Sequence, residues 1–158
     1  MLVENIMSRD VHCCRAEDTL AHAAELMWHY DCGALPVCGR GDGHHLVGII
    51  TDRDICMHAL FGAKALAELS VGGGMSRTVH SLRPSDSLAQ AERVMRESRV
   101  RRLPVIDHDG MLLGMLSLAD LAREATRERT QPRKEINETD VGHTLASICT
   151  ASRRPLAA

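Results

Sequence analysis

"MSRDVHCCRAEDTLAHAAELMWHYDCGALPV" at residues 7–37 recurs as "MSRTVHSLRPSDSLAQAERVMRESRVRRLPV" at residues 75–105. The two stretches agree at 14 of 31 positions, among them the opening M-S-R and the closing L-P-V. After L-P-V the first copy is two residues longer, and the alignment then places "GIITDRD" (48–54) over "GMLSLAD" (114–120). This regularity indicates an internal duplication, and a repeat decides the fold of the whole chain.

Each copy predicts a strand followed by a helix. A short extended segment, at residues 10–14 or 78–82, precedes Asp18 or Ser85, either of which is expected to cap the helix. Apolar side chains then recur at the spacing of one helical face. They are Leu20, Ala23, Ala24 and Met27 in the first copy, and Leu88, Ala91, Val94 and Met95 in the second.

The rest of each copy predicts a hairpin and a second helix. "ALPVC" and "RLPVI" indicate short buried strands, followed by the polar turns "GRGDGHH" and "DHDG". "HLVGII" and "MLLGML" indicate the returning strands, and the closing helices are expected to begin near Asp52 and Leu118. The order in each copy is therefore β-α-β-β-α.

These elements predict a mixed α/β (α+β) fold. A strand–helix–strand unit usually crosses over with a right hand, so the first two strands of each copy should be parallel neighbours. One copy of about 55 residues has a marginal core, so the two are expected to pack together as a pseudo-twofold module. We assign residues 1–70 and 71–125 to the two repeats, with "VGGGM" (71–75) as flexible punctuation between them. Residues 126–158 are expected to be a polar linker with a possible last helix at "VGHTLASICTAS" (141–152), packed on the module or on a partner.

The two heptapeptides place a glycine, a hydroxyl and an aspartate at positions one, four and seven. A hydroxyl followed three residues later by an acid is close to a helix capping box. In that interpretation Thr51 pairs with Asp54, and Ser117 pairs with Asp120. A structural role is sufficient to explain either motif alone.

The same motifs also favour a ligand. Each follows a strand and opens a helix, where backbone N–H groups and the helix dipole attract phosphate. Gly48 and Gly114 lie in the strands, where glycine marks close approach by a ligand or by another backbone. An aspartate one turn inside the helix can accept hydrogen bonds from ribose hydroxyls, as acids do in other nucleotide sites.

The doubled β-α-β-β-α order, with L-P-V and a final G-x-x-[ST]-x-x-D in each copy, resembles the tandem CBS domain family, named for cystathionine β-synthase. The resemblance covers about residues 1–125 and suggests a small free-standing bacterial CBS protein. It implies a regulatory module whose two clefts between the repeats bind AMP, ATP, NAD or S-adenosylmethionine. It also implies a homodimer that signals to an unidentified regulated protein and requires no cofactor.

The resemblance assigns roles to particular residues. Thr51 and Ser117 would meet phosphate, and Asp54 and Asp120 would meet ribose. The segments around residues 11–14 and 79–82 would flank adenine. The candidates in these segments are Val11, His12, Cys13, Val79 and His80.

Three arginines could add positive charge beside a phosphate. Arg101 and Arg102 stand directly before the second L-P-V, where the first copy has "DCGA" across the same turn, and Arg53 lies inside the first heptapeptide. Their simpler interpretation is a solvated turn between helix and strand. Because the copies differ here, the two clefts need not bind with equal affinity.

Composition disfavours nucleic acid and membrane partners. Lys and Arg number 19 against 21 acids, for a formal net charge of −2, and the chain has one Trp, one Tyr and one Phe. No apolar run approaches the roughly 18–20 residues that span a bilayer. The N-terminal "MLVENIMSRD" lacks the pattern of a signal peptide, so a cytoplasmic protein is expected.

The six cysteines include no C-x-x-C pair, which argues against a structural zinc site, and they are expected to be mostly reduced. Cys13 and Cys38 lie on strands that the crossover rule makes neighbours, so they are either a possible disulfide or two buried thiols. His12, Cys13 and Cys14, with His44 and His45 in the turn, offer metal-binding groups. Exposed polar histidines explain the turn more simply, and no metal is assigned.

The chain shows no nucleophile–base spacing, no P-loop and no Rossmann fingerprint, so an enzyme is not expected. The alternative to a nucleotide sensor is a ligand-free structural or stress-response dimer. Its cysteines would then modulate it by redox chemistry.

Overall fold

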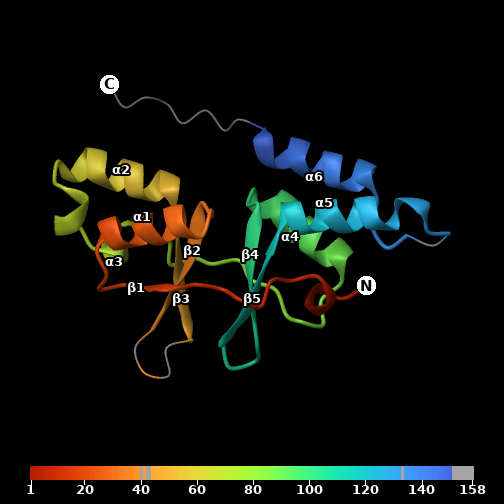
Figure 1. Cartoon of the computed structure of the whole chain (residues 1–158), viewed down its shortest axis with the longest axis horizontal. Helices are drawn as coiled ribbons and strands as arrows, with labels where there is room; N and C mark the ends of the chain where they lie inside the picture. The colour runs from red at the N-terminus through yellow and green to blue at the C-terminus, as the bar shows by residue number, and fades with distance from the viewer. Residues whose placement is uncertain (40, 42–43, 133, 151–158) are drawn as a thin grey trace. The chain divides into compact units, whose positions relative to one another are not determined.

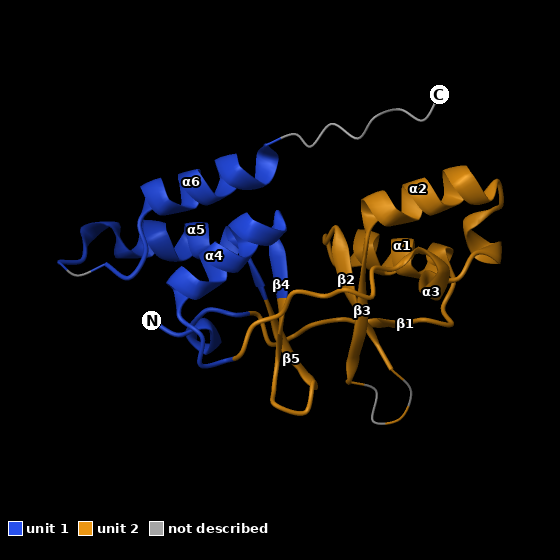
Figure 2. Ribbon diagram, turned by 180° about the vertical axis from the view of Figure 1, so that it is seen from behind, with its two compact units in different colours: residues 1–7, 84–103, 116–158 blue, residues 8–83, 104–115 orange. Residues whose placement is uncertain are grey.

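The computed structural model describes residues 1–39, 41, 44–132 and 134–150 (Figure 1). The contacts between residues divide the chain into two units, each of which combines segments that are separate in the sequence (Figure 2). Unit 1 comprises residues 1–7, 84–103 and 116–158, and unit 2 comprises residues 8–83 and 104–115. The N-terminal residues join unit 1 because Val3 N–H donates to the carbonyl of Asp86 at 2.8 Å.

Unit 2 contains the three-stranded sheet that the first repeat predicts. Its strands, in the order β1-β2-β3, are β1 (Cys14–Arg15), β2 (Ala34–Cys38) and β3 (Leu46–Thr51). β1 pairs with β2 in parallel, which confirms the crossover prediction, and β2 pairs with β3 antiparallel. The helices that follow these strands are α1 (Leu20–His29) and α2 (Asp52–Gly62).

The predicted helical face of the first repeat lies in the core of unit 2. Leu20, Ala23 and Met27 are buried there with Val37 and Ile50 of the sheet. Ala24, the fourth member of the predicted face, packs against the same cluster as a partly buried side chain. The spacing of apolar residues therefore identified the buried side of α1 correctly.

The helix caps lie one and two residues beyond the predicted ones, so the assignments to Asp18 and Ser85 were wrong. Thr19 Oγ1 accepts from His22 N–H at 3.2 Å, and Ser87 Oγ accepts from Gln90 N–H at the same distance. An N-cap must stand directly before the first helical residue, because its side chain reaches only the amides of the first turn. Asp18 instead accepts from Arg15 N–H at 2.7 Å.

"VGGGM" is not flexible punctuation, and that prediction was also wrong. Residues Val71–Gly74 form a helical turn, α3, with Val71 fully buried. Val71 N–H donates to Asp18 O and Gly72 N–H donates to Ala16 O, both at 2.8 Å. A Cβ on Gly72 would lie 3.0 Å from Ala16 O, so glycine is needed here for close packing of two backbones.

Unit 1 is built on helices. α6 (Glu138–Cys149) packs against both α4 (Leu88–Ser98) and α5 (Leu118–Arg127), as Figure 1 shows. The last helix thus begins three residues before the predicted 141 and packs on the module itself. Residues 151–152 of the predicted helix, and residues 40 and 42–43 of the predicted first turn, lie outside the described residues.

The second repeat's hairpin pairs β4 (Arg102–Ile106) with β5 (Leu112–Ser117). The division between the units falls within both strands, so each strand has residues in unit 1 and residues in unit 2. The first strand predicted for this repeat is only a parallel bridge between Leu82 and Val105. Within the described part of the chain, no helix has both the length and the apolar character to cross a membrane.

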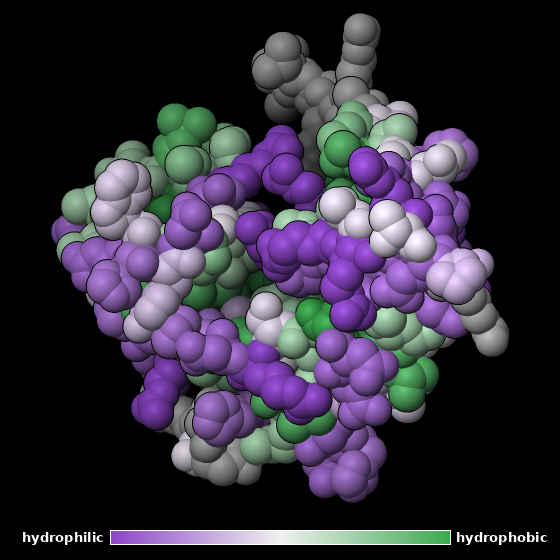
Figure 3. Space-filling view, turned by 45° about the vertical axis from the view of Figure 1, so that its right-hand side comes forward, coloured by the Kyte–Doolittle hydropathy of each residue, from purple (hydrophilic) through white to green (hydrophobic). Residues whose placement is uncertain are grey.

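Unit 2 exposes large apolar side chains on helices α1 and α2. Trp28 at the end of α1 is 90% exposed, and Leu60 and Phe61 at the end of α2 are 68% and 79% exposed. In Figure 3, hydrophobic side chains gather at the upper left, where α2 lies. These residues do not contribute to the core of the unit.

Candidate functional site

Thr51 and Asp54 form a reciprocal capping box at the start of α2. Asp54 Oδ2 accepts from the backbone N–H of Thr51 at 3.0 Å and from its hydroxyl at 2.7 Å. In return, Thr51 Oγ1 accepts from Asp54 N–H at 3.2 Å. The structural interpretation of the heptapeptide is confirmed at this position.

Ser117 and Asp120 repeat this arrangement at the start of α5. Asp120 Oδ2 accepts from the N–H and the hydroxyl of Ser117 at 2.7 and 2.6 Å, and Ser117 Oγ accepts from Asp120 N–H at 3.2 Å. The duplication therefore preserves a complete hydrogen-bonding pattern at a strand-to-helix junction, in addition to two residue types.

The two junctions differ in whether one or both oxygens of the aspartate carboxylate already have a partner. Arg123, one turn further along α5, forms an ion pair with Asp120 Oδ1. In the described residues Asp54 accepts through Oδ2 only, since the position equivalent to Arg123 is Met57. Arg123 was not predicted at this junction, although its i+3 spacing from Asp120 is typical of a helical ion pair.

The first turns differ as well. In α2, Asp52 N–H donates to Gly33 O at 3.2 Å, and Arg53 N–H donates to Asp52 Oδ1 at 2.7 Å. In α5, Leu118 N–H donates to Arg101 O at 2.9 Å, and no partner within the described residues accepts from Ala119 N–H. Of these two described helix starts, that of α5 keeps a donor available for an anion.

The glycines of the heptapeptides are buried. A Cβ on Gly48 would lie 2.7 Å from Met75 Sδ and 2.9 Å from Ser76 O. Ser76 pairs with Ile49 in an antiparallel bridge, so the backbone of Ser76 accounts for Gly48 without a ligand. Gly114 is likewise buried, within β5.

The predicted adenine-flanking segments are partly accessible. Val11, His12, Cys13 and Val79 are half-buried, whereas His80 is exposed. The ring of His12 stacks on that of Tyr30, with the ring centroids 3.4 Å apart and the planes 13° apart. Tyr30 was not predicted at the site, because only the fold brings residue 30 beside residue 12.

The candidate arginines are on the surface. Arg53 and Arg101 are exposed, and Arg102 is half-buried in β4. Arg101 lies beside the start of α5, because its carbonyl accepts from Leu118 N–H. Arg101 and Arg53 therefore each stand next to one of the two helix N-termini.

Cys13 and Cys38 come into direct contact. The Cys38 thiol donates a hydrogen bond to the sulfur of Cys13, which, with His44 and Arg15 nearby, lowers the pKa of Cys13 to about 6 against the effect of burial. The same hydrogen bond raises the pKa of Cys38, and burial adds to that shift. All six cysteines lie among the described residues and are thiols, without a disulfide bond.

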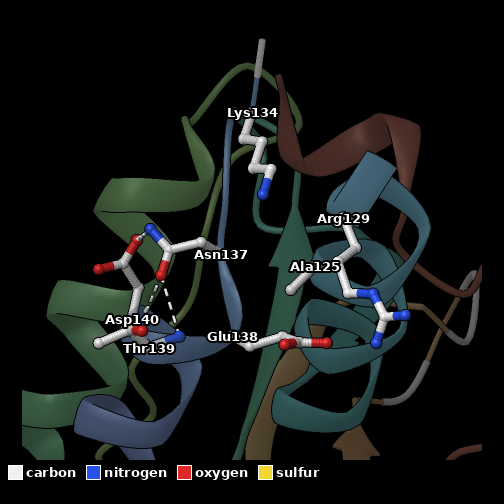
Figure 4. A pocket seen from close by; sticks show the side chains of 7 residues that line it. All are labelled: Ala125, Arg129, Lys134, Asn137, Glu138, Thr139 and Asp140. Carbon is white, nitrogen blue, oxygen red and sulfur yellow. Dashed lines mark hydrogen bonds between the residues drawn. The ribbon is translucent and has the colours of Figure 1, made fainter. Parts of the chain in front are cut away.

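Two open pockets in unit 1 lie beside α6, and neither is lined by a heptapeptide residue. One, of about 480 Å³, is lined by Arg129, Lys134 and the start of α6 (Figure 4). Asn137 Oδ1 already accepts from the N–H groups of Thr139 and Asp140, at 2.9 and 3.0 Å. Because Glu138 and Asp140 also place negative charge in this first turn, the pocket is a poor phosphate site.

The other pocket, of about 640 Å³, lies between α4 and α6 and is lined by Glu92, Arg96, Asp140 and His143 among others. Thr144 donates to Glu92 Oε1 at 3.2 Å and accepts from Arg96 at 3.0 Å. These contacts attach α6 to α4, so Glu92 and Arg96 have a structural role in this pocket without a ligand.

The predicted metal-binding groups do not converge. Within the described ranges, the one group of three possible ligands is Asp107, His108 and Asp109, in the hairpin turn between β4 and β5. His108 and Asp109 are exposed, and Asp107 Oδ1 already accepts from the N–H groups of Asp109 and Met111. The turn geometry therefore accounts for this group without an ion.

A family model for the CBS domain matches residues 3–60 and 67–127, which together include both heptapeptides. Hypoxic response protein 1 from Mycobacterium tuberculosis is 37% identical over 120 residues, which cover 75% of this chain and 81% of that protein.

Solved structures show the same fold. A crystal structure of Hypoxic Response Protein I with two coordinated zinc ions superposes with a TM-score of 0.70 at 34% identity, covering 78% of this chain and 98% of that one. CBSX2 in complex with AMP superposes with a TM-score of 0.71 at 28% identity, covering 81% of this chain and 98% of that one.

Proposed function

Since the chain belongs to the CBS domain family, we propose that it is a regulatory module that binds an adenine nucleotide at the helix N-termini capped by Thr51 and Ser117. The observation that carries the proposal is the matched pair of capping boxes, each presenting a hydroxyl and a carboxylate where a strand runs into a helix. The AMP bound by CBSX2 makes AMP the first ligand to test.

The chemistry of each junction suits one part of such a ligand. The donors at a helix N-terminus favour phosphate, and the aspartate can accept hydrogen bonds from ribose hydroxyls. Val11 and Val79, both in unit 2, offer half-buried apolar groups for adenine. ATP, NAD and S-adenosylmethionine share the adenosine part and remain candidates.

A ligand of this kind would act by favouring one conformation of the module over another. The output would be a changed affinity for an unidentified partner protein, and that protein would in turn change the affinity for the nucleotide. No catalytic role is proposed.

The melting temperature with and without each ligand tests the proposal. A ligand at about 100-fold its Kd stabilises the native state by about 2.7 kcal/mol, which corresponds to several degrees. We expect an increase with AMP that is lost in the double variant Thr51→Ala, Ser117→Ala. If none of the four ligands raises the melting temperature, the proposal is wrong.

The chain supplies a matched control for lost capping. Thr19 and Ser87 cap α1 and α4 through hydrogen bonds of the same 3.2 Å length, but no aspartate reciprocates. Thr19→Ala with Ser87→Ala should cost similar stability, about 1 kcal/mol for each cap, and should keep the response to AMP. If both double variants respond to AMP equally, the heptapeptides do not hold the ligand.

A second candidate, a structural or stress-response dimer, is favoured by the exposed apolar residues of unit 2. In the aligned repeats Trp28 corresponds to Arg96 and Phe61 to Arg127. Arg96 contacts the covering helix α6 through Thr144, whereas Trp28 is 90% exposed. Because the duplicated surface accepts a helix, we propose that a second chain of this protein packs on α1 and α2.

A further inference from the structure

The two contacting thiols are placed by the sheet of unit 2. Arg15 of β1 stands opposite Cys38 of β2 in the parallel register. Because side chains alternate along an extended segment, Cys13 points to the same face as Arg15, and hence to the same face as Cys38. The two thiols thus share one face of the sheet on neighbouring strands, and a hydrogen bond joins their sulfur atoms.

The two thiols differ in exposure, so an oxidant can reach one of them and not the other. Cys13 is half-buried and therefore accessible to a small oxidant, whereas Cys38 is only 2% exposed. Cys14, next in the chain, points into the core, and its thiol lies 3.8 Å from Pro36 O. Burial and the nearby carboxylate of Asp18 raise the pKa of Cys14 to about 12, so it remains a thiol.

We propose that Cys13 and Cys38 form a reversible redox site, in which a hydroperoxide oxidises Cys13 and Cys38 then closes a disulfide with it. The Cys13 thiolate attacks one peroxide oxygen; the O–O bond breaks, and Cys13 becomes a sulfenic acid as hydroxide leaves. Cys38 gives its proton to hydroxide and attacks the Cys13 sulfur. The S–O bond breaks as the S–S bond forms, and the hydroxide that leaves takes up the proton that Cys13 lost on forming its thiolate. Two thiols and one hydrogen peroxide therefore give a disulfide and two waters.

The groups facing Cys13 support this order of events. Cys38 on β2, His44 beyond it in the hairpin, and Arg15 on β1 all favour the thiolate of Cys13. Cys38 cannot act first, because its proton is held in the hydrogen bond to Cys13 and its side chain is buried. The site does not require nucleotide binding, so it stands or fails separately from the proposed function.

The test uses the reduced full chain, titrated with hydrogen peroxide and then alkylated. Before alkylation, we expect the intact mass of each chain to fall by about 2 Da, which is the mass of two hydrogens. After alkylation, the peptide map should show Cys13 and Cys38 protected. Cys56→Ser, which removes an exposed thiol, should leave this result unchanged. A map that links Cys14, links two chains, or shows both thiols fully alkylated would overturn the proposal.

The variant Cys38→Ala separates the two steps. Without the second thiol, we expect the sulfenic acid at Cys13 to accumulate and to be trapped by dimedone. Without the hydrogen bond from Cys38, the pH midpoint for alkylation of Cys13 should rise from about 6 towards the ordinary value of about 8.5. An unchanged midpoint, or no dimedone adduct, contradicts the assigned roles even if the variant is less stable.

Discussion

Asp52 Oδ1 accepts a hydrogen bond from the N–H of Arg53 at 2.7 Å, so the first turn of α2 already holds a carboxylate. At the equivalent positions α5 has Leu118 and Ala119, and no group in the described residues accepts from Ala119 N–H. A carboxylate at a helix N-terminus occupies a donor that a phosphate would use, and its charge repels the phosphate. The duplicated junctions therefore differ in their capacity for an anion.

This difference predicts unequal nucleotide binding. AMP should bind first at the Ser117 junction. Asp52→Asn should strengthen AMP binding at the Thr51 junction by about two- to fivefold, because one charge at a helix end changes the free energy by about 0.3–1 kcal/mol. Isothermal titration calorimetry of the wild type and of Asp52→Asn measures both sites. Adenosine, which lacks phosphate, is the control ligand and should bind both proteins equally. Equal AMP affinities in the two proteins would contradict the prediction.

The ion pair of Arg123 with Asp120 makes a second prediction for the α5 junction. Arg123 occupies Asp120 Oδ1, which a ribose hydroxyl would otherwise approach. Arg123→Gln should therefore increase the affinity for adenosine, while Arg93→Gln, an exposed arginine on α4, should not. Calorimetry with adenosine checks both variants, and a decrease for Arg123→Gln would mean that the guanidinium itself contacts the ligand.

Glu92 gives α6 a pH-dependent attachment. Burial raises the pKa of Glu92, and the nearby Asp140 adds to the shift, while the hydrogen bond from Thr144 and the charge of Arg96 oppose it. A raised carboxyl pKa means that the contribution to stability is complete below the unfolded value of about 4.3 and is lost as the pH rises through the folded value. Deprotonation of Glu92 therefore weakens the folded state.

Glu92→Gln should remove this loss. The variant is expected to be more stable than the wild type at pH 7.5, and the difference in the free energy of unfolding should shrink towards pH 4. Urea denaturation at several pH values measures it. Glu97→Gln, an exposed position on the same helix, is the control and should give a smaller change with pH. A Glu92→Gln variant that is less stable at pH 7.5 would show that the charged form is the favoured one.

A buried carboxylate anchors the segment that leads into α6. Glu128 is 2% exposed, and its Oε2 accepts from the N–H groups of Glu135 and Ile136 at 2.7 and 3.1 Å. Glu128→Ala leaves two N–H groups without this acceptor and should cost about 1–3 kcal/mol. Hydrogen exchange should accelerate at residues 135–136 and in α6. Arg129→Ala, exposed on the same 3₁₀ turn, is the control, and equal exchange in the two variants would exclude the anchor.

The local periodicities predicted the elements well, because the duplication shows each pattern twice. "ALPVC" corresponds to β2 without a shift, and α2 and α5 begin at the predicted Asp52 and Leu118. The errors arose where contacts between distant residues decide the structure. Three glycines in a row indicate flexibility, and only the packing of Gly72 on Ala16 shows why they are helical.

The candidate site was predictable to the same extent. The pairs Thr51–Asp54 and Ser117–Asp120 are three residues apart, so their hydrogen bonds follow from the sequence. The stacking of Tyr30 on His12 depends on how α1 leads into the sheet, and the contact of Cys13 with Cys38 depends on the pairing of β1 with β2. Both contacts lie in the first repeat, and they join residues that are far apart in the sequence.

The exposed end of α1 allows the self-association proposal to be tested with residues that the chain itself provides. Trp28→Arg and Phe61→Arg give unit 2 the residues that the second repeat carries at positions 96 and 127. Both native side chains are more than three-quarters exposed, so neither change should cost core stability. If a second chain packs on α1 and α2, sedimentation velocity should show a dimer for the wild type and a monomer for the double variant, with unchanged melting in dilute solution. Leu113→Arg, at an exposed apolar position in β5, is the control and should leave the dimer intact. A wild-type chain that sediments as a monomer at tens of micromolar would exclude this interface, because burying two aromatic side chains from each chain should hold a dimer at that concentration.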